Sequence, residues 1–213
     1  MTTPTSAPTP AALFNDPAPA QSLERAATAL REHGFVVEIL DDAAAARDHI
    51  KGLIPDGATV FTGASETLRL SGIDDDINQS GRYDSVKSRS RTMDRATDRN
   101  EIWKALSVPD VIVGSVAAVT ETGSLVAASA SGGQIPGYAG AAARAIWVVG
   151  AQKVVPDLAT ALRRLEEHSV PLENERAMKV YGRPAALNRL LVLNAETEPG
   201  RGIVLLLREA IGF

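Results

Sequence analysis

Short apolar runs alternate with helical segments along this chain, and this alternation restricts the fold more than any other feature. The runs FVVEIL (35–40) and ATVFTG (58–63) each follow a segment whose apolar residues recur at helical spacing. Alternation of this kind is typical of an α/β domain with a parallel sheet. The sequence therefore predicts an α/β fold with an open, mainly parallel sheet flanked by helices.

The second half of the chain continues the pattern. An apolar stripe predicts a helix from Pro156, and a second helix is expected over LENERAMKVYG (172–182), where Gly182 provides the stop. The expected strands of this half are VIVGSVAAV (111–119), LVAASA (125–130), AIWVVG (145–150), RLLVLNA (189–195) and GIVLLL (202–207).

The N-terminal residues differ from the rest of the chain. Residues 1–12, MTTPTSAPTPAA, carry no charge and no apolar core of a signal peptide. We expect a disordered tail over residues 1–15 and a single α/β domain over residues 16–213. With no targeting segment, the cytoplasm is the default compartment.

Composition excludes several classes of function. The net charge of −4 and the aromatic content of 4% argue against binding to nucleic acid, and no apolar stretch is long enough for membrane insertion. The sequence contains no cysteine, which excludes thiolate nucleophiles and an iron–sulfur cluster bound by this chain. His33 and His168 lie near expected helix ends, where a structural role is favoured. We expect no cofactor on this chain, and chemistry by Glu, Asp, Ser, Thr, Lys or Arg.

Glu121 is the first candidate for a catalytic residue. It lies in the turn Thr120-Glu121-Thr122-Gly123-Ser124 between two apolar runs, which predicts two buried strands joined by a tight turn. A carboxylate in such a place is partly desolvated, and the protein sets its pKa. The alternative is that Glu121 binds backbone N–H groups and fixes the turn.

Two further loops rich in small residues are candidates for ligand binding: residues 63–67, and residues 129–134, which lead through Pro136–Gly140 toward Arg144. Gly63-Ala64-Ser65-Glu66-Thr67 combines a flexible backbone with hydroxyl donors, although it is equally an ordinary helix N-cap. Because ligands gather beyond the carboxyl ends of parallel strands, we expect these loops and the Glu121 turn to face one crevice. The candidate ligand-binding residues are Gly63, Ser65, Glu66, Thr67, Thr122, Gly123, Ser124, Ser131, Gly132, Gly133 and Gln134.

Charged segments have simple interpretations. The basic segment 82–104 is interpreted as solvated helix with ion pairs, and the alternative is a cover that offers cations to an anionic substrate. Asp74-Asp75-Asp76 is interpreted as a helix cap rather than a magnesium site, because three consecutive acids do not face one ion. Trp147 is expected in the core.

Four segments together carry a family resemblance. GASET (63–67), AVTETGSLV (118–126), SGGQIPGYAG (131–140) and the stretch from Ala145 to His168 resemble the LUD domain, the lactate-utilization protein C family. The resemblance implies a fold similar to glucosamine-6-phosphate isomerase, ribose-5-phosphate isomerase and CoA transferases. It also implies a role in oxidation of L-lactate to pyruvate, beside separate iron–sulfur partner proteins.

The resemblance leaves two functions open. The chain is expected to be a component that binds a small carboxylate, phosphate or CoA-type ligand. The alternative is an autonomous enzyme of CoA-transferase or sugar-phosphate-isomerase type, because the Ser-Glu-Asn-Gly turn of CoA transferases is similar to residues 120–123 and would make Glu121 a nucleophile or general base. The segment Gly182–Arg189 lacks the hydroxyls and carboxylate of many family members, which leaves a different substrate open.

Overall fold

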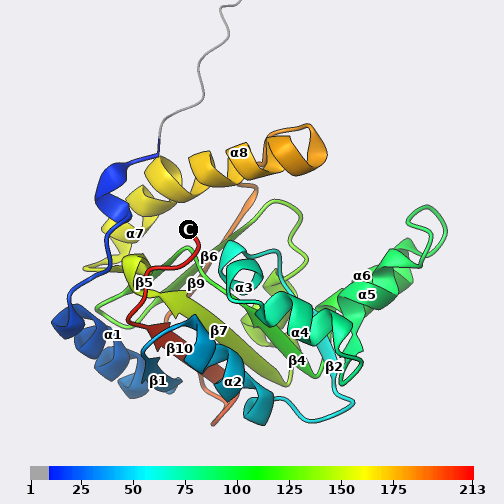
Figure 1. Ribbon diagram of the computed structural model, residues 1–213, viewed down its shortest axis with the longest axis horizontal. Helices are drawn as coiled ribbons and strands as arrows, with labels where there is room; N and C mark the ends of the chain where they lie inside the picture. Colours follow the sequence, from blue (N-terminus) through cyan, green and yellow to red (C-terminus); the bar gives the residue numbers. More distant parts are fainter. Residues whose placement is uncertain (1–9) are drawn as a thin grey trace, which may run out of the picture.

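A six-stranded parallel sheet forms the centre of the protein, which is described by a computed structural model over residues 10–213. Its strands lie in the order β1-β10-β7-β4-β2-β3, with β7 and β4 in the middle (Figure 1). Their bounds are β1 Val36–Leu40, β2 Thr59–Thr62, β3 Asp84–Ser85, β4 Val111–Gly114, β7 Arg144–Gly150 and β10 Gly202–Leu207. The predicted parallel α/β sheet is confirmed.

A second sheet of four strands was not predicted. It has the order β8-β5-β6-β9, in which β5 pairs with β8 in parallel and β6 pairs with its two neighbours antiparallel. The bounds are β5 Ala118–Thr120, β6 Leu125–Ser129, β8 Val154–Val155 and β9 Arg189–Leu193. The antiparallel pair β5–β6 is the hairpin expected around Glu121.

The chain passes directly from the first sheet to the second at two places. The run 111–119, expected as one strand, is split by Ser115–Ala117, so that β4 lies in the first sheet and β5 in the second. In the same way β7 leads through the turn Ala151–Lys153 into β8. An apolar run does not reveal such a change of sheet, because both halves are equally buried.

Helices cover the sheets, and polar residues begin several of them. Asp42, Ser65, Ser85 and Asp157 each accept a hydrogen bond from a backbone N–H in the first turn of a helix. The helices are α1 Ala20–Glu32, α2 Ala43–Leu53, α3 Glu66–Leu70, α4 Ile73–Gln79, α5 Val86–Arg91, α6 Arg99–Ser107, α7 Leu158–Arg164 and α8 Val170–Tyr181.

Alternation along β7 divides the core in two. Trp147 and Val149 belong to a cluster that includes side chains of α1 and of the second sheet. Ile146 and Val148 point to the other face and pack with side chains of α2, α3 and α4. All four side chains are fully buried, and burial of each stabilises the fold by about 1.5–3 kcal/mol. Both faces of the central strand are therefore covered, and the expectation for Trp147 is confirmed.

Two boundary predictions need correction. The helical segment expected to end near His168 continues through Leu165–Ser169 into α8, and His168 is buried inside this run. Its Nδ1 lies 3.1 Å from the carbonyl oxygen of Ala11, and Phe14 is buried beside it. Residues 11–14 of the expected tail are therefore packed on the fold, whereas residues 1–9 lie outside the described part of the chain.

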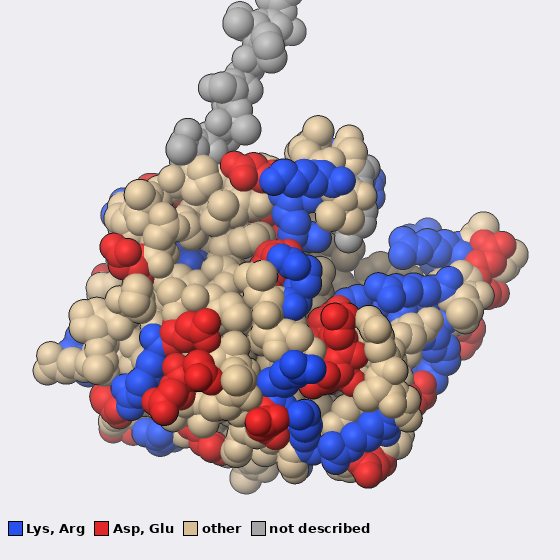
Figure 2. Space-filling model, viewed as in Figure 1, with Lys and Arg blue, Asp and Glu red and all other residues tan. Residues whose placement is uncertain are grey.

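The basic segment forms an arm. Helices α5 and α6 lie together and project from one side of the molecule (Figure 1), where Lys and Arg gather (Figure 2). Lys87, Arg89 and Lys104 make ion pairs with nearby carboxylates, as the interpretation of solvated helix with ion pairs expects. Within residues 10–213, no helix has both the length and the apolar character needed to cross a membrane.

Candidate functional site

Two of the three small-residue loops meet at the carboxyl edge of the parallel sheet. Gly63 follows β2, and a side chain at this position would lie 3.4 Å from Tyr138 Oη and 3.6 Å from Gln134 Cβ. Gly114, at the end of β4, leaves room for the same tyrosine, since a Cβ there would overlap Tyr138 Oη. The loops 63–67 and 131–140 are therefore side by side, although the second loop follows β6 of the four-stranded sheet and not a strand of the parallel sheet.

Within the first loop the polar side chains have different partners. Ser65 Oγ accepts from Leu68 N at 3.3 Å and caps α3, which is the ordinary N-cap role. Glu66 pairs with Arg69 one turn later. Thr67 is fully buried, and its Oγ1 contacts a lysine from a distant part of the chain. Of this loop, Thr67 is the residue that points into the fold.

The third loop is held mainly by its own hydrogen bonds. Gln134 Oε1 lies 2.9 Å from Ser129 Oγ, and its Nε2 donates to Ala128 O at 3.1 Å. Gly132 has a φ of +89° and donates its N–H to Ser129 Oγ. Gly133 is buried in the same loop, and Ser131 is exposed. Gln134 is thus fixed next to Gly63 rather than left free.

The Glu121 turn lies elsewhere. It precedes β6, whereas the loop 131–134 follows β6, so the two are at opposite ends of this strand, roughly 16 Å apart. Gly123 packs against Ala29 of α1, and its carbonyl oxygen is 2.9 Å from His33 Nδ1. The expectation that all three loops share one crevice therefore fails for the Glu121 turn, because an antiparallel hairpin reverses the direction of its strands.

Glu121 is ionised and paired with an arginine of α1. Arg25 Nε and Nη2 donate to its two carboxylate oxygens at 2.5 and 2.9 Å. These hydrogen bonds hold the pKa of Glu121 below its usual range. The turn itself is closed by hydroxyl contacts between Thr120 and Thr122, and Ser124 Oγ donates to Asn194. The role of Glu121 in catalysis stays a prediction.

The sequence reasoning missed the most unusual charged residue at the carboxyl edge, Lys153. It ends the turn that follows β7, and it is only 1% exposed. Its Nζ donates to Thr67 Oγ1 at 2.8 Å and lies 3.0 Å from Ser115 Oγ. Thr67 follows β2 and Ser115 follows β4, so the segments beyond three neighbouring strands meet at this nitrogen.

Lys153 has no carboxylate partner among residues 10–213. A buried lysine is normally paired with an acid, because desolvation disfavours the charged form. Here burial and the nearby Arg164 guanidinium hold the pKa of Lys153 well below its usual range. The sequence does contain a sign of this buried lysine. Gln152-Lys153 lies in a short turn between the apolar runs AIWVVG and VVP, and because both runs are buried strands, the two polar side chains between them are buried as well.

Arg164 is a second buried basic residue beside the same turn. Its Nε donates to Gln152 O at 3.1 Å, and one terminal nitrogen donates to Ala117 O. Burial lowers its pKa to about 10, so it remains charged at neutral pH. Burial, and after it the nearby Arg164 guanidinium, lower the pKa of His168. This region therefore carries positive charge with no buried acid beside it in the described part of the chain.

The segment Ile211–Gly212 covers the group. Ile211 O accepts from Thr67 Oγ1 at 3.3 Å, and Gln152 Nε2 donates to Gly212 O at 2.7 Å. Gly212 has a φ of +67°, and a Cβ there would overlap Thr67 Oγ1. In Figure 1 the C-terminal end accordingly lies close to α3. The Thr67 hydroxyl thus links the amine of Lys153 to this segment, because it accepts from Nζ and donates to Ile211 O.

The three consecutive acids point to three different partners. Asp74 Oδ1 accepts from Thr62 Oγ1 at 2.7 Å and from Lys87 Nζ at 2.7 Å. Gly72, not an acid, is the N-cap of α4. Among residues 10–213 no group of three or more histidines and acids is placed to hold a metal ion. The partners of the three acids are Lys87 for Asp74, Gln79 for Asp75 and Arg47 for Asp76.

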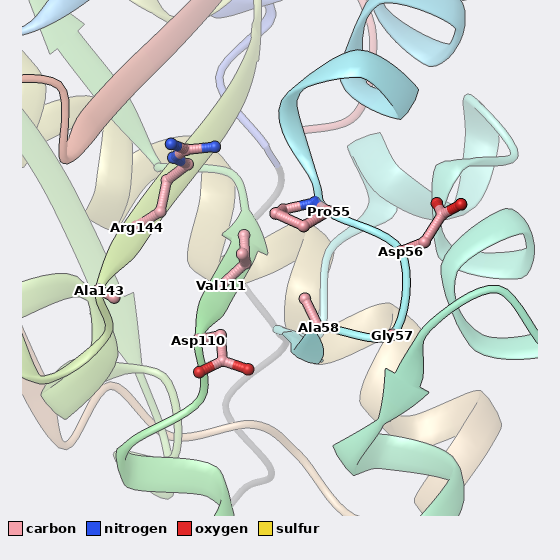
Figure 3. Close-up of a pocket in the computed structure, with 8 residues that line it drawn as sticks. All are labelled: Pro55, Asp56, Gly57, Ala58, Asp110, Val111, Ala143 and Arg144. Atoms are coloured by element: carbon pink, nitrogen blue, oxygen red, sulfur yellow. The ribbon is translucent and has the colours of Figure 1, made fainter.

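A shallow hollow of about 420 Å³ lies at the opposite, amino edge of the sheet (Figure 3). Its residues come from the segments that lead into β2, β4 and β7. Asp110 accepts from Thr59 N and Oγ1 at 2.8 and 2.6 Å, and Arg144 donates to Leu53 O. Because these charged groups already have partners, we favour the carboxyl edge as the functional region.

Comparison with known proteins adds a family and a fold. A family model described as LUD domain matches residues 23–189. The crystal structure at 1.70 Å of a DUF162 family protein from Deinococcus radiodurans is similar, with a TM-score of 0.53 and 13% sequence identity. The similarity covers 88% of this chain and 97% of that chain, and at this identity it concerns the fold. No curated protein matches the chain.

Proposed function

Because the LUD-domain match over residues 23–189 places this chain in the LUD-domain family, which is associated with lactate utilization, we propose that it binds a small carboxylate in the oxidation of L-lactate to pyruvate. The proposed site is the group formed by Lys153, Thr67 and Ser115. The observation that supports it is the burial of Lys153 without a carboxylate partner in the described part of the chain. A ligand carboxylate would accept hydrogen bonds from this group and balance the charge of the buried Arg164 guanidinium beside it.

Binding to the purified protein tests this proposal. L-lactate and pyruvate are expected to raise the unfolding temperature of the wild type, by an amount that grows with ligand concentration. A ligand at 100 times its Kd adds about 2.7 kcal/mol to the free energy of unfolding. Lys153→Met is expected to lose this response. Lys179→Met, at an exposed lysine of α8, is the matched control and keeps it.

Electron transfer is assigned to separate iron–sulfur partner proteins. The chain has no cysteine to bind a cluster by thiolates. Tagged protein from cells grown on L-lactate is expected to retain an iron–sulfur protein, identified by mass spectrometry. A deletion strain that grows normally on L-lactate, together with a pull-down that recovers no such partner, would contradict this assignment.

The alternative is an acyl-CoA-dependent transferase that uses Glu121. The observation that bears on it is that the Glu121 carboxylate is ionised, which is the form that attacks, and the pair with Arg25 at both oxygens would have to open before attack. Incubation with acyl-CoA thioesters followed by hydroxylamine would then modify Glu121, and peptide mapping would locate the change. An unmodified Glu121 across short-chain, branched and hydroxylated thioesters would rule out this alternative.

A further inference from the structure

The amine of Lys153 has the surroundings of an uncharged nitrogen. An ammonium has three N–H donors, whereas Nζ has two polar partners among residues 10–213. Thr67 Oγ1 donates its own proton to Ile211 O, so it accepts from Nζ. The Ser115 hydroxyl has no second partner in the same residues and is free to donate to the nitrogen lone pair. Both protonation states satisfy these two contacts and leave one N–H unpaired, but the neutral amine leaves no buried charge without a counter-ion among the described residues.

The charges around this nitrogen favour the same state. Arg164 and His168 are the titratable groups that face the turn from the segment 158–169, and neither is an acid. Thr67, from α3, and Ser115, from the crossing after β4, contribute neutral hydroxyls. A lysine that is desolvated next to another cation is a nucleophile towards carbonyl compounds.

Arg164 adds an unpaired donor to the same region. Its Nη1 donates to Ala117 O and to Ser169 Oγ, and its Nε donates to Gln152 O. Its Nη2 is buried and has no hydrogen-bond partner among the described residues. Buried guanidinium donors are normally paired, and a carboxylate is the group that pairs with them most strongly. The region thus offers an amine for a carbonyl and an N–H for a carboxylate.

We propose that Lys153 forms an imine with a 2-oxo acid whose carboxylate is bound by Arg164. The inference rests on the proposed function, because it needs a small carboxylate at this site. The amine nitrogen attacks the ketone carbon, and both hydrogens of the amine leave with the ketone oxygen as water. Ser115 Oγ, 3.0 Å from Nζ, is placed to pass a proton from nitrogen to the departing oxygen. Imine formation is not a redox reaction, so it needs no oxidant or reductant, and addition of water to the imine reverses it.

Reductive trapping tests the imine. The full-length protein is incubated with pyruvate at neutral pH, treated with sodium borohydride, digested and mapped by mass spectrometry. One reduced 2-oxo acid is expected on Lys153, at a yield at least tenfold above that on the exposed lysines Lys104 and Lys179. L-lactate, which has no carbonyl, is expected to give no adduct and to lower the yield with pyruvate.

Two variants sharpen the result. Ser115→Ala is expected to slow trapping several-fold while the final adduct stays on Lys153, and Lys153→Arg is expected to abolish it. The wild-type peptide map decides the question even if a variant fails to fold. Equal labelling of all lysines, or pyruvate binding with no adduct on Lys153, overturns the imine and leaves the proposed function intact. Absence of any thermal shift with lactate or pyruvate contradicts the proposed function itself.

Discussion

Lys153 makes the stability of this protein depend on pH, and the sign follows from its surroundings. Its pKa is lowered in the folded state by burial and Arg164, whereas in the unfolded chain it has the ordinary value of about 10.4. Between these two values the unfolded state binds one more proton than the folded state. The free energy of unfolding therefore rises with pH across this interval, by at most about 1.4 kcal/mol per pH unit.

Replacing Lys153 by methionine removes this dependence. The variant is expected to gain stability relative to the wild type at pH 7, and the gain is expected to shrink as the pH rises towards 10. Urea unfolding at pH 7, 8 and 9 measures it, with Lys179→Met as the control at an exposed position. A gain that is the same at every pH would mean that Lys153 is protonated in the folded protein.

Glu121 gives a second prediction for a single residue. The hydrogen bond from Arg25 is the largest cause that lowers the pKa of Glu121, so Arg25→Gln is expected to raise it. An NMR titration of the Glu121 carboxyl carbon measures the change. Arg69→Gln removes a different surface ion pair and should leave Glu121 unaffected. Because Arg25 is half exposed, solvent screens the pair and it contributes little to stability; that contribution is present above the carboxyl pKa and is lost at acid pH.

At the scale of the elements, the covering segment 211–212 depends on a glycine. Gly212 and Gly200 both have positive φ, but they differ in the space around them: a Cβ at Gly200 would meet no atom within 4 Å, whereas one at Gly212 would overlap Thr67 Oγ1. Gly200→Ala is expected to cost about 1–2 kcal/mol through backbone strain alone. Gly212→Ala is expected to cost about 1–3 kcal/mol more, because Thr67 must move. Thermal unfolding of the two variants compares them, and equal losses would contradict the contact.

Strands and helices were predicted well where a short local sequence pattern determines them. The strands β1, β2, β7 and β10 follow from apolar runs, and Asp42 begins α2 as a capping residue should. Sequence patterns did not predict elements whose bounds depend on contacts between distant parts of the chain. Nothing in the run 111–119 marks Ser115 as the point where the chain changes sheets. His168 was placed at a helix end, but contacts with the distant Ala11 and Phe14 stabilise a continuous helical segment there.

The candidate site was predicted only in part for a similar reason. Thr67 lies beyond β2 at the carboxyl edge, as expected for a loop that follows a parallel strand, whereas Gln134 reaches the neighbourhood of Gly63 from the four-stranded sheet. Glu121 drew attention because it stands alone between apolar runs, and that pattern does not reveal the arginine of α1 that pairs with it. Lys153 was missed for another reason. What makes it unusual is that no acid lies near its amine among residues 10–213, and the spacing of residues in a sequence does not show which side chains are neighbours in space.

For the whole molecule, local stability is expected to decrease from the central strands to the arm. Strands β4 and β10 are buried along their whole length, whereas α6 has no buried residue. Amide hydrogen exchange is therefore expected to be slowest in β4, β7 and β10 and faster by orders of magnitude in α5 and α6. Mass spectrometry of peptic peptides measures this. Protection of residues 86–107 equal to that of β7 would show that the arm is part of the cooperative core.

The two crossings between the sheets are tied together by side chains of the candidate site. Ser115 lies in one crossing and Lys153 in the other, with 3.0 Å between their polar atoms, and Arg164 donates to a carbonyl oxygen of each crossing, those of Ala117 and Gln152. The same side chains therefore serve as cross-links between the six-stranded and the four-stranded sheet. A substitution at Lys153 or Arg164 consequently changes the joint between the two sheets together with the site, so activity and sheet packing are not independent properties of this protein.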